Sequence, residues 1–194
     1  MAERRTVTLT DPRALRAMAH PTRIELIGLL RRGGPLTATQ AAREVGESPA
    51  SCSFHLRQLA KYGLVEEAGG GRGRERPWQA TAISTEWPVL SESEETQAAG
   101  AMLSRVVVER YFEKAVEWLE RQPTEPPEWA EAAFFGDDLV HMTAAELRGV
   151  EAKIRELLEP FLKRLEDPAP PVEGSRPVSL IAFAFPLAEP EREG

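Results

Sequence analysis

The sequence has little of what metal-binding, secreted or membrane-spanning proteins usually need. It holds one cysteine, Cys52, and three histidines, so an internal disulfide is impossible and a site rich in cysteine or histidine is disfavoured. No apolar run approaches the roughly 20 residues that span a bilayer. The first residues lead into Thr10-Asp-Pro12 rather than an apolar segment, so we expect no secretory signal and a cytoplasmic protein.

The sequence also lacks recognisable catalytic sets. It has no Gly-rich phosphate loop after a strand, no nucleophilic serine motif and no constellation of carboxylates with a histidine. We therefore expect no enzyme and no cofactor. His141 beside Asp137 and Asp138 is the only cluster that resembles metal ligands, and it is too small to predict a metal site.

The charge is divided unevenly along the chain. Residues 1–82 hold 13 Lys and Arg against 8 Asp and Glu, a net of +5, whereas residues 83–194 hold 11 against 23, a net of −12. A basic part joined to an acidic part is typical of a protein that binds a polyanion. The alternative is that the uneven charge arises by chance. The charge alone therefore does not establish a polyanion binder, and the spacing of residues must distinguish the two interpretations.

Capping residues divide the first 82 residues into short elements. Asp11-Pro12 begins a helix that ends near His20, and Pro21 begins a second helix that ends at Gly33. Thr37 and Gln40 have the spacing of a capping box. The predicted order continues with a helix to Val45, a helix over 49–62, a strand over 64–67, a basic loop over 69–76 and a return strand over 78–81.

Three segments together resemble the ArsR family of winged helix-turn-helix repressors. They are Leu15-Arg-Ala-Met-Ala-His-Pro-Thr-Arg-Ile-Glu-Leu-Ile27, Ser51-Cys-Ser-Phe-His-Leu-Arg-Gln-Leu59 and Lys61-Tyr-Gly-Leu-Val65. The resemblance covers about residues 11–82 and implies a DNA-binding domain in a homodimer. Many members sense metals through a Cys-x-Cys pair at the stretch that reads Thr37-Ala-Thr-Gln-Ala-Ala-Arg-Glu-Val45 here, so the resemblance does not extend to metal sensing.

The helix over 49–62 is the predicted recognition helix. At 100° per residue, Cys52, Leu56 and Leu59 share one side and predict the core face. The opposite side and its flanks predict the contacts with the major groove of double-stranded DNA. These residues are Ser48, Ala50, Ser51, Ser53, Phe54, Arg57 and Lys61.

Two interpretations stay open for several residues of this helix. Phe54 contacts a thymine methyl group, or it packs under the loop or a neighbouring helix. Arg57 binds guanine or phosphate in preference to being a solvated cation. We expect His55 to be partly buried and hydrogen-bonded, and Cys52 to be a small core residue.

Two further segments predict contacts with the DNA backbone. Thr37, Thr39 and Gln40 lie at a helix N-terminus, where free N–H groups can bind phosphate. Arg72, Arg74 and Arg76 alternate with glycine or glutamate in the basic loop, which suits a wing that follows a groove but also a solvated turn.

The second half of the chain begins with one long predicted helix over about 94–122. Its apolar stripe is too wide for a single partner, so we expect burial on two sides. Met102, Val106, Phe112 and Leu119 are the predicted homodimer contacts. Pairing through them would place two recognition helices about one DNA turn apart on a near-palindromic site.

The remaining residues predict a small α+β module. A capping box at Thr143 predicts a helix to about Leu165 with an apolar inward face, and alternating residues predict strands over 138–142 and 178–185. Aromatic residues either build the core of this module and the dimer interface, which we favour, or line a pocket for a small apolar effector. The pocket candidates are Trp87, Trp118, Trp129, Phe134, Phe183 and Phe185.

The predicted fold class is mainly α with a small β component. We expect a flexible segment over 1–10, a winged helix-turn-helix domain over 11–82, a linker and long dimerisation helix over 83–122, the α+β module over 123–188 and a disordered tail over 189–194. The predicted function is a sequence-specific DNA-binding regulator, a homodimeric repressor with a possible apolar effector. The alternative is a winged-helix module that binds a protein partner and no DNA.

Overall fold

A computed structural model describes residues 6–71, 76–88, 90–165 and 172–188. The chain forms two compact units, Met1–Glu125 and Pro126–Gly194. The predicted tail over 189–194 and the first five residues lie outside the described part of the chain.

Capping side chains set where the helices of the first unit begin. The Asp11 carboxylate accepts a hydrogen bond of 2.8 Å from the Arg13 N–H, and Ser48 Oγ accepts one of 3.1 Å from the Ser51 N–H. These contacts confirm the helix starts predicted from the sequence. The helices are α1 (Pro12–Met18), α2 (Pro21–Gly33), α3 (Ala38–Val45), α4 (Pro49–Lys61) and α5 (Glu94–Arg121), followed by a short 3₁₀ helix over Gln122–Thr124.

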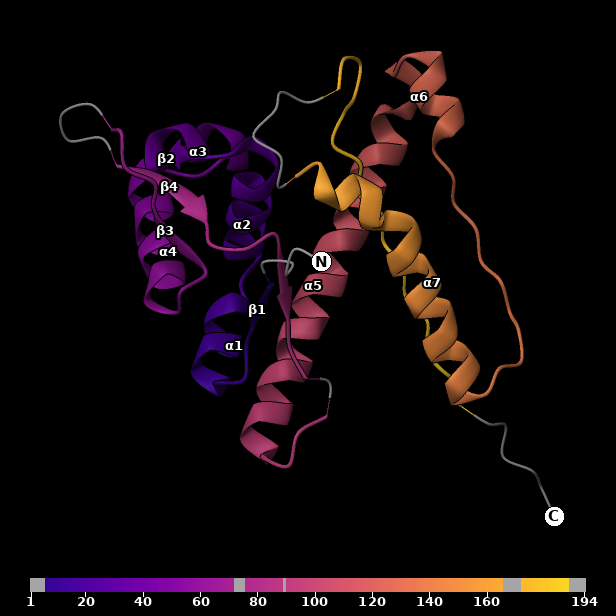
Figure 1. The fold of residues 1–194 in the computed structure, drawn as a ribbon. Helices are drawn as coiled ribbons and strands as arrows, with labels where there is room; N and C mark the ends of the chain where they lie inside the picture. The colour runs from indigo at the N-terminus through magenta and orange to yellow at the C-terminus, as the bar shows by residue number, and fades with distance from the viewer. Residues whose placement is uncertain (1–5, 72–75, 89, 166–171, 189–194) are drawn as a thin grey trace. The chain divides into compact units, whose positions relative to one another are not determined.

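A three-stranded antiparallel sheet with the order β2–β4–β3 lies beside α2, α3 and α4 (Figure 1). Its strands are β2 (Leu36–Thr37), β3 (Val65–Glu67) and β4 (Pro77–Ala80). The register pairs Glu67 with Trp78, so the predicted hairpin is confirmed to within a residue. β2 was not predicted, because two residues are too few to show an alternating pattern.

The prediction of a flexible segment over 1–10 is wrong for its last residues. β1 (Thr6–Thr8) pairs in parallel with β5 (Ser84–Glu86), and the Leu9 N–H donates to the Glu86 carbonyl at 2.8 Å. Leu9 is buried in the core. The partner strand lies almost 80 positions away in sequence, so no local pattern signals this pairing.

One hydrophobic core joins the helices of the first unit. Leu15, Leu26, Leu56 and Leu103, from α1, α2, α4 and α5, are buried completely or almost so. α1 lies alongside the N-terminal half of α5. Gly100 allows the chain before α5 to approach closely, because a Cβ there would lie 3.0 Å from the Pro88 carbonyl oxygen.

The described residues of the second unit form two helices. They are α6 (Pro127–Ala132) and α7 (Ala144–Lys163). α7 begins with the predicted capping box, in which the Glu146 N–H donates to Thr143 Oγ1 at 3.2 Å and the Thr143 N–H donates to Glu146 Oε2 at 2.7 Å.

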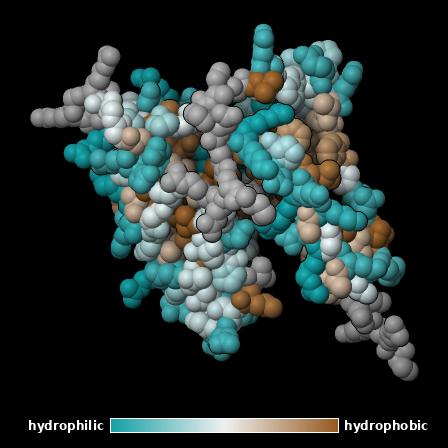
Figure 2. Space-filling view, viewed as in Figure 1, coloured by the Kyte–Doolittle hydropathy of each residue, from teal (hydrophilic) through white to brown (hydrophobic). Residues whose placement is uncertain are grey.

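The predicted α+β character of the second unit is wrong. Residues 138–142 and 178–185 form no strand, and the side chain of Val178 is 72% exposed. Alternation predicts a strand only where a neighbouring strand supplies hydrogen bonds and a packed surface covers one face. The apolar side of α7 is also open rather than inward, since Leu157 and Phe161 are exposed. Figure 2 shows hydrophobic side chains at the surface over this helix.

Candidate nucleic-acid interface

A tight turn holds α3 and α4 at a fixed angle. α3 ends at Gly46, whose φ of 70° lies in the left-handed region that favours glycine. Ser48 begins α4 only two residues later. The two helices pack closely on each other, so the turn and the core together fix which side of α4 faces outward.

α4 has one buried face and one open face, as its spacing predicts. Cys52, Leu56 and Leu59 are fully buried in the core, and burial raises the pKa of the Cys52 thiol. On the opposite side Phe54 is 49% exposed. Its ring meets that of the next residue edge-on, with 5.3 Å between the Phe54 and His55 ring centroids.

Polar donors flank Phe54 on the open face of α4. Arg57 Nη1 donates to Ser53 Oγ at 3.2 Å, one turn earlier. This contact lays the guanidinium along the helix and uses one of its five N–H donors. Ala50 and Lys61 are exposed at the two ends of the same face, and Ser51 is half-buried. We define the recognition face as Ala50, Ser51, Ser53, Phe54, Arg57 and Lys61.

The N-terminus of α3 presents a pre-arranged turn. The Gln40 N–H donates to Thr37 Oγ1 at 3.2 Å, and the Thr37 N–H donates to Gln40 Oε1 at 2.8 Å. The predicted capping box is therefore present, and the Thr37 and Gln40 side chains cap the N-terminus of α3. Thr39 is exposed at the same end.

The described part of the wing places one predicted arginine. Arg76 Nη1 donates to both Glu67 carboxylate oxygens, at 2.9 and 3.0 Å. The pair is exposed and closes the base of the hairpin. Arg72 and Arg74 lie outside the described residues.

A histidine pair lies behind the recognition face, between α2 and α4. The His20 and His55 ring centroids are 4.5 Å apart. The Nδ1 atoms of both rings and Nε of Arg23 are buried and find no hydrogen-bond partner among the described residues. The prediction that His55 is buried is confirmed, but within the described part of the chain its Nδ1 atom makes no hydrogen bond. Burial lowers the pKa of both histidines, and the Arg23 charge lowers them further.

The predicted dimer residues lie on α5 in two environments. Met102, Phe112 and Leu119 are exposed, Phe112 by 60%. Val106 is half-buried and packs on the core of its own unit, so less of its side chain can contact a partner.

The aromatic residues predicted for an effector pocket also differ in environment. Trp87 packs on the core of the first unit, and its Nε1 donates to Ser104 Oγ at 3.0 Å. Trp118 stacks with the Arg121 guanidinium, and Trp129 with that of Arg176. Phe134 is 84% exposed and Phe185 is 70% exposed, whereas Phe183 is about half covered. The structure thus gives each residue its own surroundings, and several of them lack the enclosure that an apolar ligand needs.

The described residues also lack the features of two other kinds of site. They contain no group of three or more His, Cys, Asp or Glu side chains arranged to hold a metal ion. Within the same residues, no helix has both the length and the apolar character needed to cross a bilayer.

Comparison with known proteins supports the local fold. Residues 18–68 match a family model described as a helix-turn-helix domain. No curated protein matches the sequence. Together with the sheet beside α3 and α4, this match confirms the predicted fold class, which is mainly helical with a small sheet in a winged helix-turn-helix arrangement.

Several solved structures are similar to the chain. Reduced HlyU from Vibrio cholerae has 22% identity, covering 47% of this chain and 82% of its own, with a TM-score of 0.31. A MarR-family protein of Mycobacterium tuberculosis has 15% identity, with coverages of 75% and 82% and a TM-score of 0.28. A mutant of ZitR from Lactococcus lactis has 14% identity, coverages of 73% and 73%, and a TM-score of 0.29. Likenesses of this size carry no argument about this chain.

Proposed function

We propose that the chain is a transcriptional regulator that binds double-stranded DNA through the recognition face of α4. The observation that carries the proposal is the half-exposed Phe54, set among polar donors on a helix whose other side is fully buried. The match of residues 18–68 to a helix-turn-helix domain supports the same reading.

The recognition face offers chemistry that suits base edges in the major groove. The Arg57 guanidinium can donate two parallel hydrogen bonds to guanine N7 and O6, and the Phe54 ring provides an apolar surface for a thymine methyl group. The hydroxyl groups of Ser51 and Ser53 suit either bases or phosphates. Thr39, with the N–H groups at the start of α3, would bind the flanking phosphate.

The proposed regulator is a homodimeric repressor of ArsR type. Exposed apolar side chains on α5, among them Met102, Phe112 and Leu119, support pairing of two copies. A two-fold axis would present two α4 helices to two half-sites of a near-palindromic operator. Occupation of such a site within a promoter would block transcription.

In vitro selection from random duplexes at low salt, followed by fluorescence anisotropy on the selected sequence, tests the proposal. The wild-type chain is expected to select an inverted repeat and to bind it less tightly as salt rises. Arg57→Ala should lower the ratio of specific to non-specific affinity by about tenfold or more. Arg148→Ala removes the same charge from exposed α7 and should leave the ratio unchanged.

Failure to bind any duplex at low salt would overturn the proposal. It would favour the alternative, in which the winged domain docks a protein partner and the acidic second half of the chain competes with nucleic acid. Equal loss of specificity in both variants would place the reading of bases elsewhere than on α4.

A further inference from the structure

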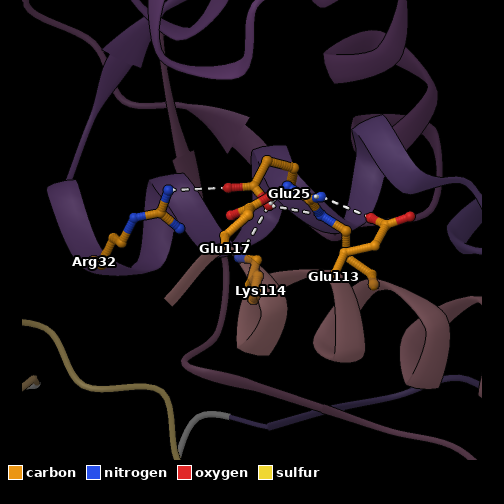
Figure 3. A network of polar contacts seen from close by, with 6 residues as sticks. Glu25, Arg32, Glu113, Lys114 and Glu117 are labelled. Carbon is orange, nitrogen blue, oxygen red and sulfur yellow. Dashed lines mark hydrogen bonds and ion pairs between the residues drawn. The ribbon is translucent and has the colours of Figure 1, made fainter. Parts of the chain in front are cut away.

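The Glu25 carboxylate on α2 contacts three cationic side chains where α2 meets α5. Glu25 Oε2 accepts hydrogen bonds from Arg110 Nε at 3.1 Å and Arg110 Nη2 at 2.9 Å, and it lies 2.9 Å from Lys114 Nζ. Glu25 Oε1 accepts from Arg32 Nη2 at 3.1 Å. Figure 3 shows the Glu25 side chain linked by dashed lines to Arg32 on one side and to Lys114 on α5, with Glu117 drawn close to Glu25. We refer to Glu25, Arg32, Arg110 and Lys114 as the Glu25 clamp.

The Glu25 carboxylate is shielded from solvent and stays ionised. The side chain of Glu25 is only 13% exposed, and those of Arg110 and Lys114 are mostly covered. Burial alone would raise the pKa of Glu25, but the hydrogen bonds from Lys114 and Arg110 and the charge of Lys114 lower it to about 2. Charge-assisted contacts of this kind are short and directional, so they fix geometry as well as contribute energy.

The clamp holds α5 at a point beyond the residues that pack on the hydrophobic core. The last fully buried residue of α5 is Leu103, and the last apolar residues that pack on the core are Val106 and Val107. The two cations of α5 follow at Arg110 and Lys114, before the last exposed apolar residues of the helix, Val116 and Leu119. The clamp therefore ties the outgoing half of α5 to the helix-turn-helix unit beyond the reach of the hydrophobic core.

A small change in direction at the clamp becomes a large displacement at the proposed dimer contact. Sixteen residues separate Leu103 from Leu119, which is about 24 Å along a helix. A tilt of about 5° moves the far end by about 2 Å. Two protomers together would shift their recognition helices by about 4 Å, which is roughly one base-pair step of 3.4 Å.

We propose that Glu25 determines which half-site spacing the dimer accepts, by fixing the direction of α5 relative to α4. This role rests on the proposed function, because spacing has meaning only for a dimer on DNA. Glu25 is a positioning residue here: it contacts no base, and it acts through the helix that carries the partner contact.

The first test measures the direction of α5 without DNA. Spin labels at Arg43→Cys on α3 and Glu120→Cys on α5, in a Cys52→Ala background, report the distance between the two helices by double electron–electron resonance. Glu25→Gln is expected to broaden or shift the distance distribution within one chain by about 2 Å or more. Mixing with excess unlabelled protein removes distances between copies.

Glu113→Gln is the matched control for this test. It makes the same chemical change and removes a contact of 2.8 Å to the same Arg110, but that contact lies within α5. The control should keep the wild-type distribution. An unchanged distribution in Glu25→Gln, or an equal change in both variants, would overturn the proposal.

The second test uses the selected operator with its spacer lengthened or shortened by one base pair. Wild type and Glu113→Gln should discriminate against the altered spacers, and Glu25→Gln should lose that discrimination by about fivefold or more. If circular dichroism shows that Glu25→Gln does not fold, Lys114→Met replaces it in the same comparison of spacing preference. A wild-type chain that binds DNA and a folded Glu25→Gln variant that keeps its spacing preference would overturn only the spacing role. No binding by the wild type overturns the proposed function itself.

Discussion

The ionised state of Glu25 predicts a specific dependence of stability on pH. The pKa of its carboxyl group is about 2 in the folded chain, against an ordinary value of 4.5. A shift of this size corresponds to about 3 kcal/mol at neutral pH, and partial solvent screening of its partners reduces this to about 2 kcal/mol. Because the folded pKa is depressed, the contribution is complete above pH 4.5 and is lost as pH falls towards 2.

Urea unfolding of the wild type and Glu25→Gln at pH 7, 4.5 and 3 measures this contribution. The glutamine variant resembles the protonated carboxyl group, so the difference in unfolding free energy should be largest at pH 7. It should fall to roughly two fifths of that value at pH 3. The other carboxylates titrate in both proteins, and their effects cancel in the difference.

Two results would refute the reasoning about Glu25. A difference that stays constant from pH 7 to pH 3 would mean that its charge contributes nothing to folding. If the Glu25→Gln variant is as stable as the wild type at pH 7, the attraction between Glu25 and its cations does not exceed the free-energy cost of desolvating these charges. Glu113→Gln, whose contacts lie at the exposed edge, should differ from the wild type by no more than about 0.5 kcal/mol at each pH.

Three further predictions concern the core, the histidine pair and the partner contact. Leu56→Ala should lower the unfolding free energy by about 2–5 kcal/mol in urea titrations, since Leu56 is fully buried, and a loss below about 1 kcal/mol would contradict the packing described. The two neutral histidines should contribute fully to the unfolding free energy above pH 6.5, and this contribution should decline below that pH, because the folded pKa values of His20 and His55 are lowered. A His55→Phe variant with an unchanged decline in urea titrations would refute this cause. Phe112→Glu should weaken self-association by about tenfold or more in sedimentation equilibrium, and an unaltered dimer would remove Phe112 from the interface.

The elements of the first unit could be predicted where the sequence signals them locally. Asp11, Thr37 and Ser48 cap helices at the positions that their chemistry requires. The spacing of Cys52, Leu56 and Leu59 correctly predicted the buried side of α4. These are short-range effects, so a single sequence contains the whole signal.

The features that escaped prediction depend on distant partners. β1 and β5 are three residues each and lie far apart in sequence, so neither shows a pattern of its own. The Glu25 clamp joins residues 85 positions apart, and a charged residue on a helix ordinarily indicates only a solvated face. The segments over 138–142 and 178–185 show the converse. Their residues alternate, but no described residue pairs with them as a strand.

Photocrosslinking from position 54 tests most directly whether the open face of α4 lies on DNA. The measurement replaces Phe54 with photoreactive p-benzoylphenylalanine and irradiates the protein with the selected duplex. The same replacement of the exposed Phe134 in the second unit serves as the control. We predict that the photoreactive residue at position 54 becomes covalently attached to DNA and that the one at position 134 does not. A duplex that is retarded by the protein but crosslinks only from position 134, or crosslinks from position 54 that join only protein chains, would contradict it.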